Sequence, residues 1–181
     1  MFDPNDPITL TRDCEAILIP QGTPISLTEG FVVYIVQALG GSVTVNANGN
    51  LARIAGRDLD AVGMEPEAPL VTSENPTIEE IRDLAWSQLK SCYDPEIPIN
   101  IVDLGLIYDC TVQEAANGIN VRVEMTLTAP GCGMGEFLVE DVRSKLQEIP
   151  KVEQIDVELV FEPMWDQTMM SDAARLQVGL Y

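Results

Sequence analysis

Cys132 stands in a glycine-rich stretch, residues 128–136, whose flanking patterns place it between a strand and the start of a helix. The backbone N–H groups at a helix start are unpaired and the helix dipole favours negative charge. A thiol at this place is therefore shifted toward the thiolate, the form that attacks electrophiles and binds metals. Glycines at positions 131, 133 and 135 leave room for a bulky group beside the sulfur. The alternative interpretation is a buried structural cysteine in a tight turn.

Carboxylates in the irregular segment 93–108 form a second group of candidate functional residues. Asp94, Glu96 and Asp103 alternate there with aliphatic residues, and two prolines prevent the segment from being helical. Such acids are costly to bury unless each one finds a partner. They could supply hard oxygen ligands, or a docking surface, beside the cysteine loop. The alternative is a loop in which the carboxylates cap backbone N–H groups.

The absence of histidine from the whole sequence excludes several kinds of site. It rules out Ser-His-Asp and Cys-His catalysis and every histidine-ligated metal centre. The four cysteines are scattered singly, without a C-x-x-C pair, which argues against a zinc knuckle and a thioredoxin motif. No activating base is evident near Cys132, which counts against a thiol enzyme.

Composition limits the partners. The chain of 181 residues has a net charge of −19 and 46% hydrophobic residues, with the acids spread over both halves. Phosphate backbones and anionic lipid surfaces repel such a protein, so we expect neither nucleic acid nor a membrane as partner. The sequence has no apolar run long enough to span a bilayer, and its N-terminus lacks the order of a signal peptide. We therefore expect a cytoplasmic protein.

The first part of the chain predicts a small all-β module over residues 1–63. Short runs rich in Val, Ile and Tyr are separated by turn residues, and Asn48-Gly49 is a hairpin signal because both residues tolerate positive φ. The predicted strands cover residues 13–19, 31–39, 42–46 and 50–54. Residues 64–75 have the Pro, acid and Ser content of an interdomain linker.

The second part, residues 76–181, predicts a small domain with the order α-β-β-α-β. Periodicity indicates a helix near 76–92, strands over 106–113 and 119–127, a helix from 135 to about 148, and a strand over 152–160. The overall fold class is therefore α+β, with a small mixed sheet whose helices lie on one face. A tail rich in Met and Trp follows. It is either a flap packed on the core or an adaptable lid and partner surface over the cysteine loop.

Four motifs, in the same order, resemble those of the metal–sulfur cluster assembly family. This family includes the cytosolic iron–sulfur targeting factors and the phenylacetate-pathway maturation protein PaaD. The motifs are Asp94-Pro95-Glu96-Ile97-Pro98, Asn100-Ile101-Val102-Asp103-Leu104-Gly105-Leu106-Ile107-Tyr108, Thr128-Ala129-Pro130-Gly131-Cys132-Gly133, and Trp165 with Met169 downstream. The upstream module, with Arg12-Asp13 and the stretches 40–45 and 49–54, resembles the N-terminal extension of the longer bacterial SufT proteins.

The resemblance implies an auxiliary factor in iron–sulfur protein maturation, without enzyme turnover. It places the family's reactive cysteine on Cys132 and its acidic motif on Asp94 and Glu96. One departure is Gly133, since many relatives have a proline after the cysteine. The Gly-Cys-Gly-Met-Gly form is similar to that of the SufT branch.

The first functional hypothesis is a carrier in which Cys132 transiently ligates iron or an iron–sulfur cluster. A cluster usually needs four ligands. Two chains, or one chain and a client apoprotein, would have to share it, which predicts a homodimer or a client complex. Oxygen ligands from Asp94 or Glu96 would complete a labile metal site. The expected partners are client apoproteins and the assembly machinery.

Two further hypotheses belong to other classes. An adaptor would bind no metal and would recruit clients through the acidic loop (Asp94, Glu96, Asp103) and the tail (Trp165, Met169), leaving Cys132 with a structural role. A thiol enzyme would use Cys132 as its nucleophile, and the absence of histidine counts against it.

Overall fold

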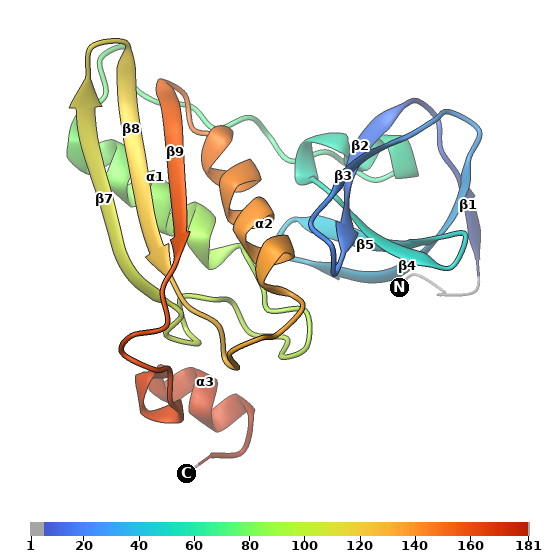
Figure 1. Cartoon of the computed structure of the whole chain (residues 1–181). Coiled ribbons are helices and arrows are strands. Elements are labelled where there is room, and N and C mark those ends of the chain that lie inside the picture. Colours follow the sequence, from blue (N-terminus) through green and yellow to red (C-terminus); the bar gives the residue numbers. More distant parts are fainter. Residues whose placement is uncertain (1–5, 181) are drawn as a thin grey trace. The chain divides into compact units, whose positions relative to one another are not determined.

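Strands dominate the first part of the chain, and two helices with a three-stranded sheet form the second part (Figure 1). The computed structural model describes residues 6–180. Contacts divide the chain into two compact units, with the boundary in the sequence between Pro69 and Leu70. The predicted α+β class is confirmed by these elements.

Unit 1 is built on a six-stranded antiparallel sheet with the order β1-β4-β5-β6-β2-β3. Two of the strands, β1 and β3, lie outside the predicted ones, because β1 has three residues and β3 begins at a proline that resembles a turn. A 3₁₀ helix, η1, follows the strands. The elements are β1 (Pro7–Thr9), β2 (Cys14–Ile19), β3 (Pro24–Leu27), β4 (Val32–Leu39), β5 (Ser42–Ala47), β6 (Asn50–Ile54) and η1 (Gly56–Val62).

The predicted Asn48-Gly49 hairpin joins β5 to β6. Both residues have positive φ, 52° and 86°, which matches the twist of the flanking strands. The Asn46 Oδ1 accepts a hydrogen bond from the Gly49 N–H at 2.7 Å and fixes the turn. Alternation then buries one face of the sheet, as in β4, where Val33 and Ile35 are buried between exposed neighbours.

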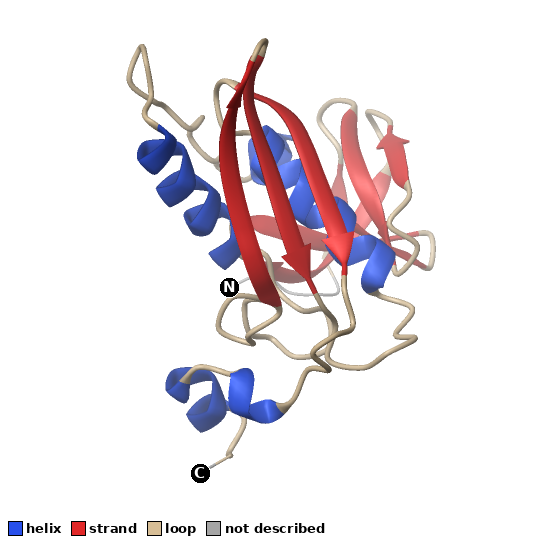
Figure 2. Cartoon of the chain, turned by 60° about the vertical axis from the view of Figure 1, so that its left-hand side comes forward, coloured by secondary structure: helices blue, strands red, loops and turns tan. Residues whose placement is uncertain are grey.

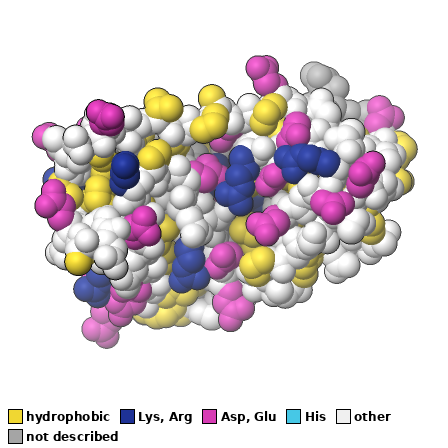
Figure 3. All heavy atoms as spheres, turned by 90° about the horizontal axis from the view of Figure 1, so that it is seen from above, with side chains coloured by type: hydrophobic (Ala, Val, Ile, Leu, Met, Phe, Trp, Pro, Cys, Tyr) yellow, Lys and Arg dark blue, Asp and Glu magenta, His cyan; other side chains and the backbone are white. Residues whose placement is uncertain are grey.

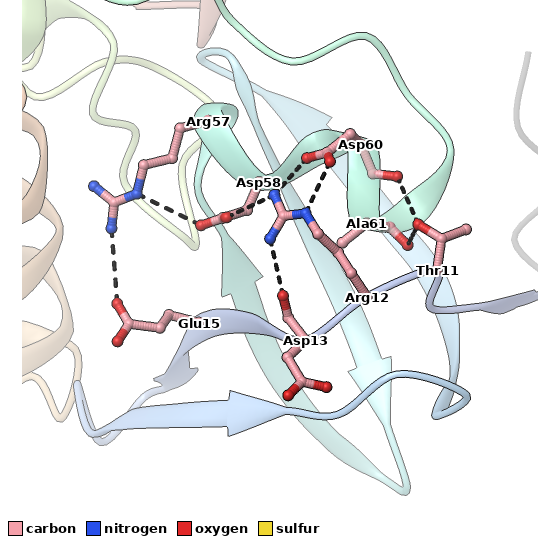
Figure 4. A network of polar contacts seen from close by, with 8 residues as sticks. All are labelled: Thr11, Arg12, Asp13, Glu15, Arg57, Asp58, Asp60 and Ala61. Atoms are coloured by element: carbon pink, nitrogen blue, oxygen red, sulfur yellow. Dashed lines mark hydrogen bonds and ion pairs between the residues drawn. The ribbon is translucent and has the colours of Figure 1, made fainter.

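Arg12 fastens the chain before β2 to η1 (Figure 4). Its Nε donates to Asp60 Oδ2 at 2.8 Å, and its Nη2 reaches Asp60 Oδ1 at 2.5 Å and Asp58 Oδ1 at 2.9 Å. The Thr11 hydroxyl adds a bond to the Asp60 carbonyl at 3.1 Å. The fork of the guanidinium matches the Asp60 carboxylate, so this pair has better geometry than an ordinary surface ion pair.

Acid is expected to weaken unit 1 through this pair. The hydrogen bond from Arg12 lowers the pKa of Asp60 below its ordinary value. The pair therefore stabilises the fold above a pH of about 4, and this contribution is lost as the pH falls through the folded pKa. Scanning calorimetry should show a smaller fall in melting temperature from neutral to acidic pH for Asp60→Asn than for the wild type. Equal losses in the two proteins would contradict this role.

Unit 2 contains the predicted α-β-β-α-β order. Strands β7 and β8 form an antiparallel hairpin, and β8 pairs with β9 in parallel through the crossover helix α2, so the sheet is mixed as predicted. The elements are α1 (Ile78–Lys90), β7 (Ile107–Ala115), β8 (Gly118–Met125), α2 (Gly135–Gln147) and β9 (Val152–Leu159), followed by η2 (Gln167–Met169) and α3 (Asp172–Gln177).

Helices α1 and α2 cover one face of this sheet, as the view in Figure 2 shows. Their apolar stripes face the sheet, and Ile81, Leu89, Leu138 and Val142 are among the buried residues. Thr77 caps α1, with its Oγ1 accepting from the Glu80 N–H at 3.1 Å. The other face carries polar side chains and a hollow of about 300 Å³ lined in part by Thr111, Arg122 and Asp156.

Carboxylates are scattered over the face drawn in Figure 3 instead of gathering in one patch. Within residues 6–180, none of the helices has the length and apolar character needed to cross a bilayer.

Candidate functional site

The three segments that carry the candidate site residues lie at the same end of the sheet of unit 2 (Figure 1). The strand register places Ile107, Met125 and Leu159 side by side. The acidic loop, residues 91–106, enters β7 at this row. The cysteine loop, residues 126–134, leaves β8 there, and the tail, residues 161–180, follows β9. The Thr126 N–H donates to the Leu106 carbonyl at 2.8 Å and ties the first two loops together.

The cysteine loop holds Cys132 in a turn directly before α2. The Cys132 N–H donates to the Ala129 carbonyl at 3.2 Å, and the Gly135 N–H donates to the Cys132 carbonyl at 3.3 Å. Met134 is the N-cap of α2, and its side chain makes no capping hydrogen bond. Cys132 therefore lies two residues before the N-cap, close to a helix N-terminus whose first N–H groups have no side-chain cap.

Two glycines leave open space on either side of the partly exposed Cys132 side chain. A Cβ built on Gly131 or Gly133 would meet no heavy atom within 4 Å. Gly131 also has φ +77°, a conformation that side chains rarely adopt. Gly135 differs, because a Cβ there would lie 2.9 Å from Leu127 Cδ1. The third glycine thus permits close packing of α2, whereas the first two leave the sulfur accessible.

The other three cysteines are buried free thiols. Burial raises the pKa of Cys14, and burial with the nearby Asp109 charge raises the pKa of Cys110 to about 11. Cys92, two residues after the end of α1, is fully buried, and its Sγ lies 3.6 Å from the Gln88 carbonyl oxygen. All three thiols are therefore shielded from solvent, and the raised pKa values of Cys14 and Cys110 keep these two protonated at neutral pH.

Selective alkylation should follow from this difference in exposure. With iodoacetamide at neutral pH, Cys132 of the native protein is expected to react at least about tenfold faster than any other cysteine. Peptide mass spectrometry over a time course measures the four rates separately, and the urea-unfolded protein is the control in which all four react. A second cysteine that reacts as fast as Cys132 in the native protein would contradict the burial described above.

In the acidic loop, Asp94 and Glu96 lie in different environments. Asp94 is buried, and its Oδ1 accepts from the N–H groups of Glu96 at 2.8 Å and Ile97 at 2.9 Å. It therefore holds the turn, as the capping alternative predicted. The Glu96 side chain is exposed and is free to reach a ligand or partner.

Asp103 is held by a second local turn. The Asn100 Nδ2 donates to Asp103 Oδ2 at 2.6 Å, and the Asp103 N–H donates to Asn100 Oδ1 at 2.9 Å. Its carbonyl accepts from the Ser171 N–H of the tail at 2.8 Å. The carboxylate and the backbone of Asp103 thus serve different neighbours.

The tail residues Trp165 and Met169 face the acidic loop. The Trp165 Nε1 donates to the Leu104 carbonyl at 2.8 Å, and the Met169 Sδ lies 3.6 Å from the Tyr108 hydroxyl. The Tyr108 hydroxyl also lies 2.7 Å from the Pro163 carbonyl oxygen. The sequence prediction missed Tyr108 and Gly105 as contact points, although both belong to the motif segment. The signal available in the sequence was Gly105 itself, because a glycine in an irregular segment can mark a close approach of another backbone.

The described residues form no group of three or more Cys, Asp or Glu side chains placed to hold a metal ion. Cys132, Asp94 and Glu96 are at the same end of the sheet, but within residues 6–180 they do not assemble such a group.

Comparison with protein families gives a match within unit 2. Residues 82–157 match the family described as iron-sulfur cluster assembly protein. This range includes the acidic loop, the cysteine loop and the strands and helix between which they lie.

Known proteins with similar sequences have related descriptions. The chain is 48% identical over 91 residues to a Fe-S protein maturation auxiliary factor of Porphyromonas gingivalis, which covers 50% of this chain and 84% of that protein. It is 40% identical over 87 residues to the Fe-S protein maturation auxiliary factor SufT of Staphylococcus aureus, and this match covers 48% of this chain and 96% of that protein. A crystal structure from Bacillus anthracis, described as a domain of unknown function, aligns with a TM-score of 0.52 and 36% identity. The alignment covers 57% of this chain and 95% of that structure.

Proposed function

The chain belongs to the iron–sulfur cluster assembly protein family, and we propose that it acts in the cytoplasm as a non-enzymatic auxiliary factor that carries iron or a cluster on Cys132 to client apoproteins. The observation that supports this most directly is the exposure of Cys132. It is the one cysteine that is not buried, and it stands between two open glycine positions at the start of α2. The relatives described as maturation auxiliary factors support the same role.

The cargo would be shared with a second molecule. One thiolate cannot hold a cluster that usually has four ligands, and the described part of the chain contains no three-ligand group. A second copy that contributes its own Cys132, or a client that contributes cysteines, would complete the set. Glu96 is exposed and can add an oxygen ligand, while Asp94 holds the turn that presents it. A site with few ligands from the carrier releases its cargo readily, as transfer requires.

Replacing Cys132 tests this proposal. Anaerobic reconstitution of the wild type with iron and sulfide should give a visible chromophore and about one cluster per two chains. Cys132→Ser is expected to retain less than about a tenth of this iron. Its melting temperature should stay unchanged, because the side chain is partly exposed and the hydroxyl has nearly the size of the thiol. Cys14→Ala, which removes a buried thiol in unit 1, is the matched control and should bind as much iron as the wild type. Full iron binding by Cys132→Ser would exclude the carrier role.

An adaptor role is the second candidate, and the exposed apolar residues of the tail favour it. Met164 is 69% exposed and Leu176 is 61% exposed, more than most side chains of this type in a folded chain. In this case a client would bind equally well to the wild type and to Cys132→Ser, and Met164→Asp would weaken the complex. Pull-down of an iron–sulfur apoprotein with these variants separates the two roles.

A further inference from the structure

The tail donates hydrogen bonds to a row of backbone carbonyls in the acidic loop. The Trp165 Nε1 donates to the Leu104 carbonyl at 2.8 Å and the Ser171 N–H to the Asp103 carbonyl at 2.8 Å. The Gln177 Nε2 lies at 3.5 Å from the Pro98 carbonyl. We call these three acceptors, with Gly105 beside them, the carbonyl row. All three carbonyl oxygens accept hydrogen bonds from N–H groups of the tail.

Gly105 makes this surface flat enough for a backbone to lie on it. The residue has φ +74°, and a Cβ built there would overlap the Met169 carbonyl oxygen and lie 2.7 Å from the Met169 carbonyl carbon. The tail therefore rests on the main chain of the acidic loop without an intervening side chain. Only glycine satisfies both the conformation and the close approach.

The tail is held weakly in comparison with the helices of the unit. Among its described residues, Met170 and Ala174 are the buried apolar ones, at 6% and 2% exposure. Phe161, by contrast, is 45% exposed. A segment with few buried apolar contacts opens at a lower free energy than the whole unit unfolds.

Charge also disfavours the tail as the best occupant. The loop beneath it carries Asp94, Glu96 and Asp103, and the tail itself carries three acids, Glu162, Asp166 and Asp172. Its one basic residue, Arg175, is paired with Asp172 within α3. A donor-rich segment with Lys or Arg in place of these acids would meet the same carbonyls without this repulsion. It could also pair with the exposed Glu96, whereas Asp94 and Asp103 accept hydrogen bonds within the loop.

We propose that the carbonyl row is a docking surface for a basic, Trp- or Arg-containing segment of a client protein, and that the tail occupies it until such a segment replaces it. This inference rests on the proposed function, in which clients bind at this end of unit 2. Trp165 shows the chemistry that the surface accepts, an aromatic side chain whose N–H reaches the Leu104 carbonyl. Arginine offers the same combination of a flat group and N–H donors, with a positive charge.

Two labelled peptides test the proposal with the full chain. The first has the sequence of residues 161–180, and the second carries Glu162→Lys and Gln177→Arg in that sequence, which makes it basic. The protein variant Trp165→Ala loosens the tail and leaves the carbonyl row intact. Fluorescence polarisation is expected to show that Trp165→Ala binds the basic peptide about tenfold more tightly than the wild type, because the tail no longer competes. The basic peptide should bind more tightly than the first one at low salt, and the difference should shrink at high salt.

Gly105→Ala added to Trp165→Ala should reduce peptide affinity at least about tenfold, since the new Cβ fills the flat position. Gly63→Ala in the same background is the matched control, because Gly63 also has positive φ, +75°, but faces open space. If circular dichroism shows that the Gly105 variant is misfolded, Tyr108→Phe replaces it. This change removes only the hydroxyl near Pro163 and should weaken binding several-fold.

Three results would overturn the proposal. They are equal affinity of the wild type and Trp165→Ala, peptide binding that survives Gly105→Ala in a folded protein, and tighter binding of the acidic first peptide. The last result would assign the surface to the tail of a second copy. None of these readouts involves iron, so loss of the carrier role in the Cys132→Ser experiment and loss of this docking surface can be told apart.

Discussion

Phe137→Ala is expected to reduce the free energy of unfolding of unit 2 by about 4 kcal/mol, within the range of about 3–5 kcal/mol for the loss of a buried phenyl ring. Phe137 is fully buried in the first turn of α2, five residues after Cys132. Removing the ring leaves a cavity where the helix must be held against the sheet. Because the cysteine loop ends at this turn, we also expect its conformation to loosen.

Urea unfolding followed by tryptophan fluorescence measures this effect in the right unit, because Trp86 and Trp165 both belong to unit 2. Phe161→Ala is the matched control. Its ring is 45% exposed, so we expect a change within about 0.5 kcal/mol. A loss below about 1.5 kcal/mol for Phe137→Ala would mean that the site collapses around the smaller side chain, and that the phenyl ring does not hold α2 in place.

Gly105→Ala is expected to detach the tail and to destabilise unit 2 by more than about 2 kcal/mol. An alanine at positive φ alone costs roughly 1–2 kcal/mol. The overlap with the Met169 carbonyl adds to this cost, because a backbone group cannot move aside as a flexible side chain can. The loop or the tail must therefore shift, and the bond from Trp165 to Leu104 is lost.

Gly131→Ala provides the comparison for this prediction. Gly131 has φ +77°, close to the φ of Gly105, but a Cβ there would meet nothing within 4 Å. We expect Gly131→Ala to lose only the free energy of unfolding that alanine at positive φ costs. The difference between the two variants therefore measures the contact with the tail. Limited proteolysis should cut the tail of Gly105→Ala much faster than that of Gly131→Ala, and its tryptophan emission should shift to the red. Similar cleavage of both would show that the tail does not depend on Gly105.

The two predictions describe different supports of one region. Phe137 holds the helix behind the cysteine loop, and Gly105 accepts the tail on the acidic loop. If both hold, a variant such as Gly105→Ala changes access to the acidic loop while Cys132 keeps its surroundings. Iron binding and client docking could then be measured separately in the same chain.

Local pattern was sufficient for most elements of the fold. Period-two alternation predicted β8, and the apolar stripe from Ile78 to Leu89 predicted α1, since these patterns reflect which side of an element is buried. A run rich in Val, Ile and Tyr between turn residues predicted β4. The Asn48-Gly49 turn was predictable because its residue types favour positive φ. The short strands β1 and β3 were missed because they contain too few residues to show a period.

The sequence by itself determined the singular position of Cys132 among glycines, the lack of histidine and the acidic character of the chain. These follow from residue types alone. Only the tertiary structure decided which segments meet, because the row of Ile107, Met125 and Leu159 depends on the pairing register of three strands. The docking of the tail was equally hidden. Trp165 binds the backbone carbonyl of Leu104, and since every residue type has such a carbonyl, no side-chain pattern could reveal it.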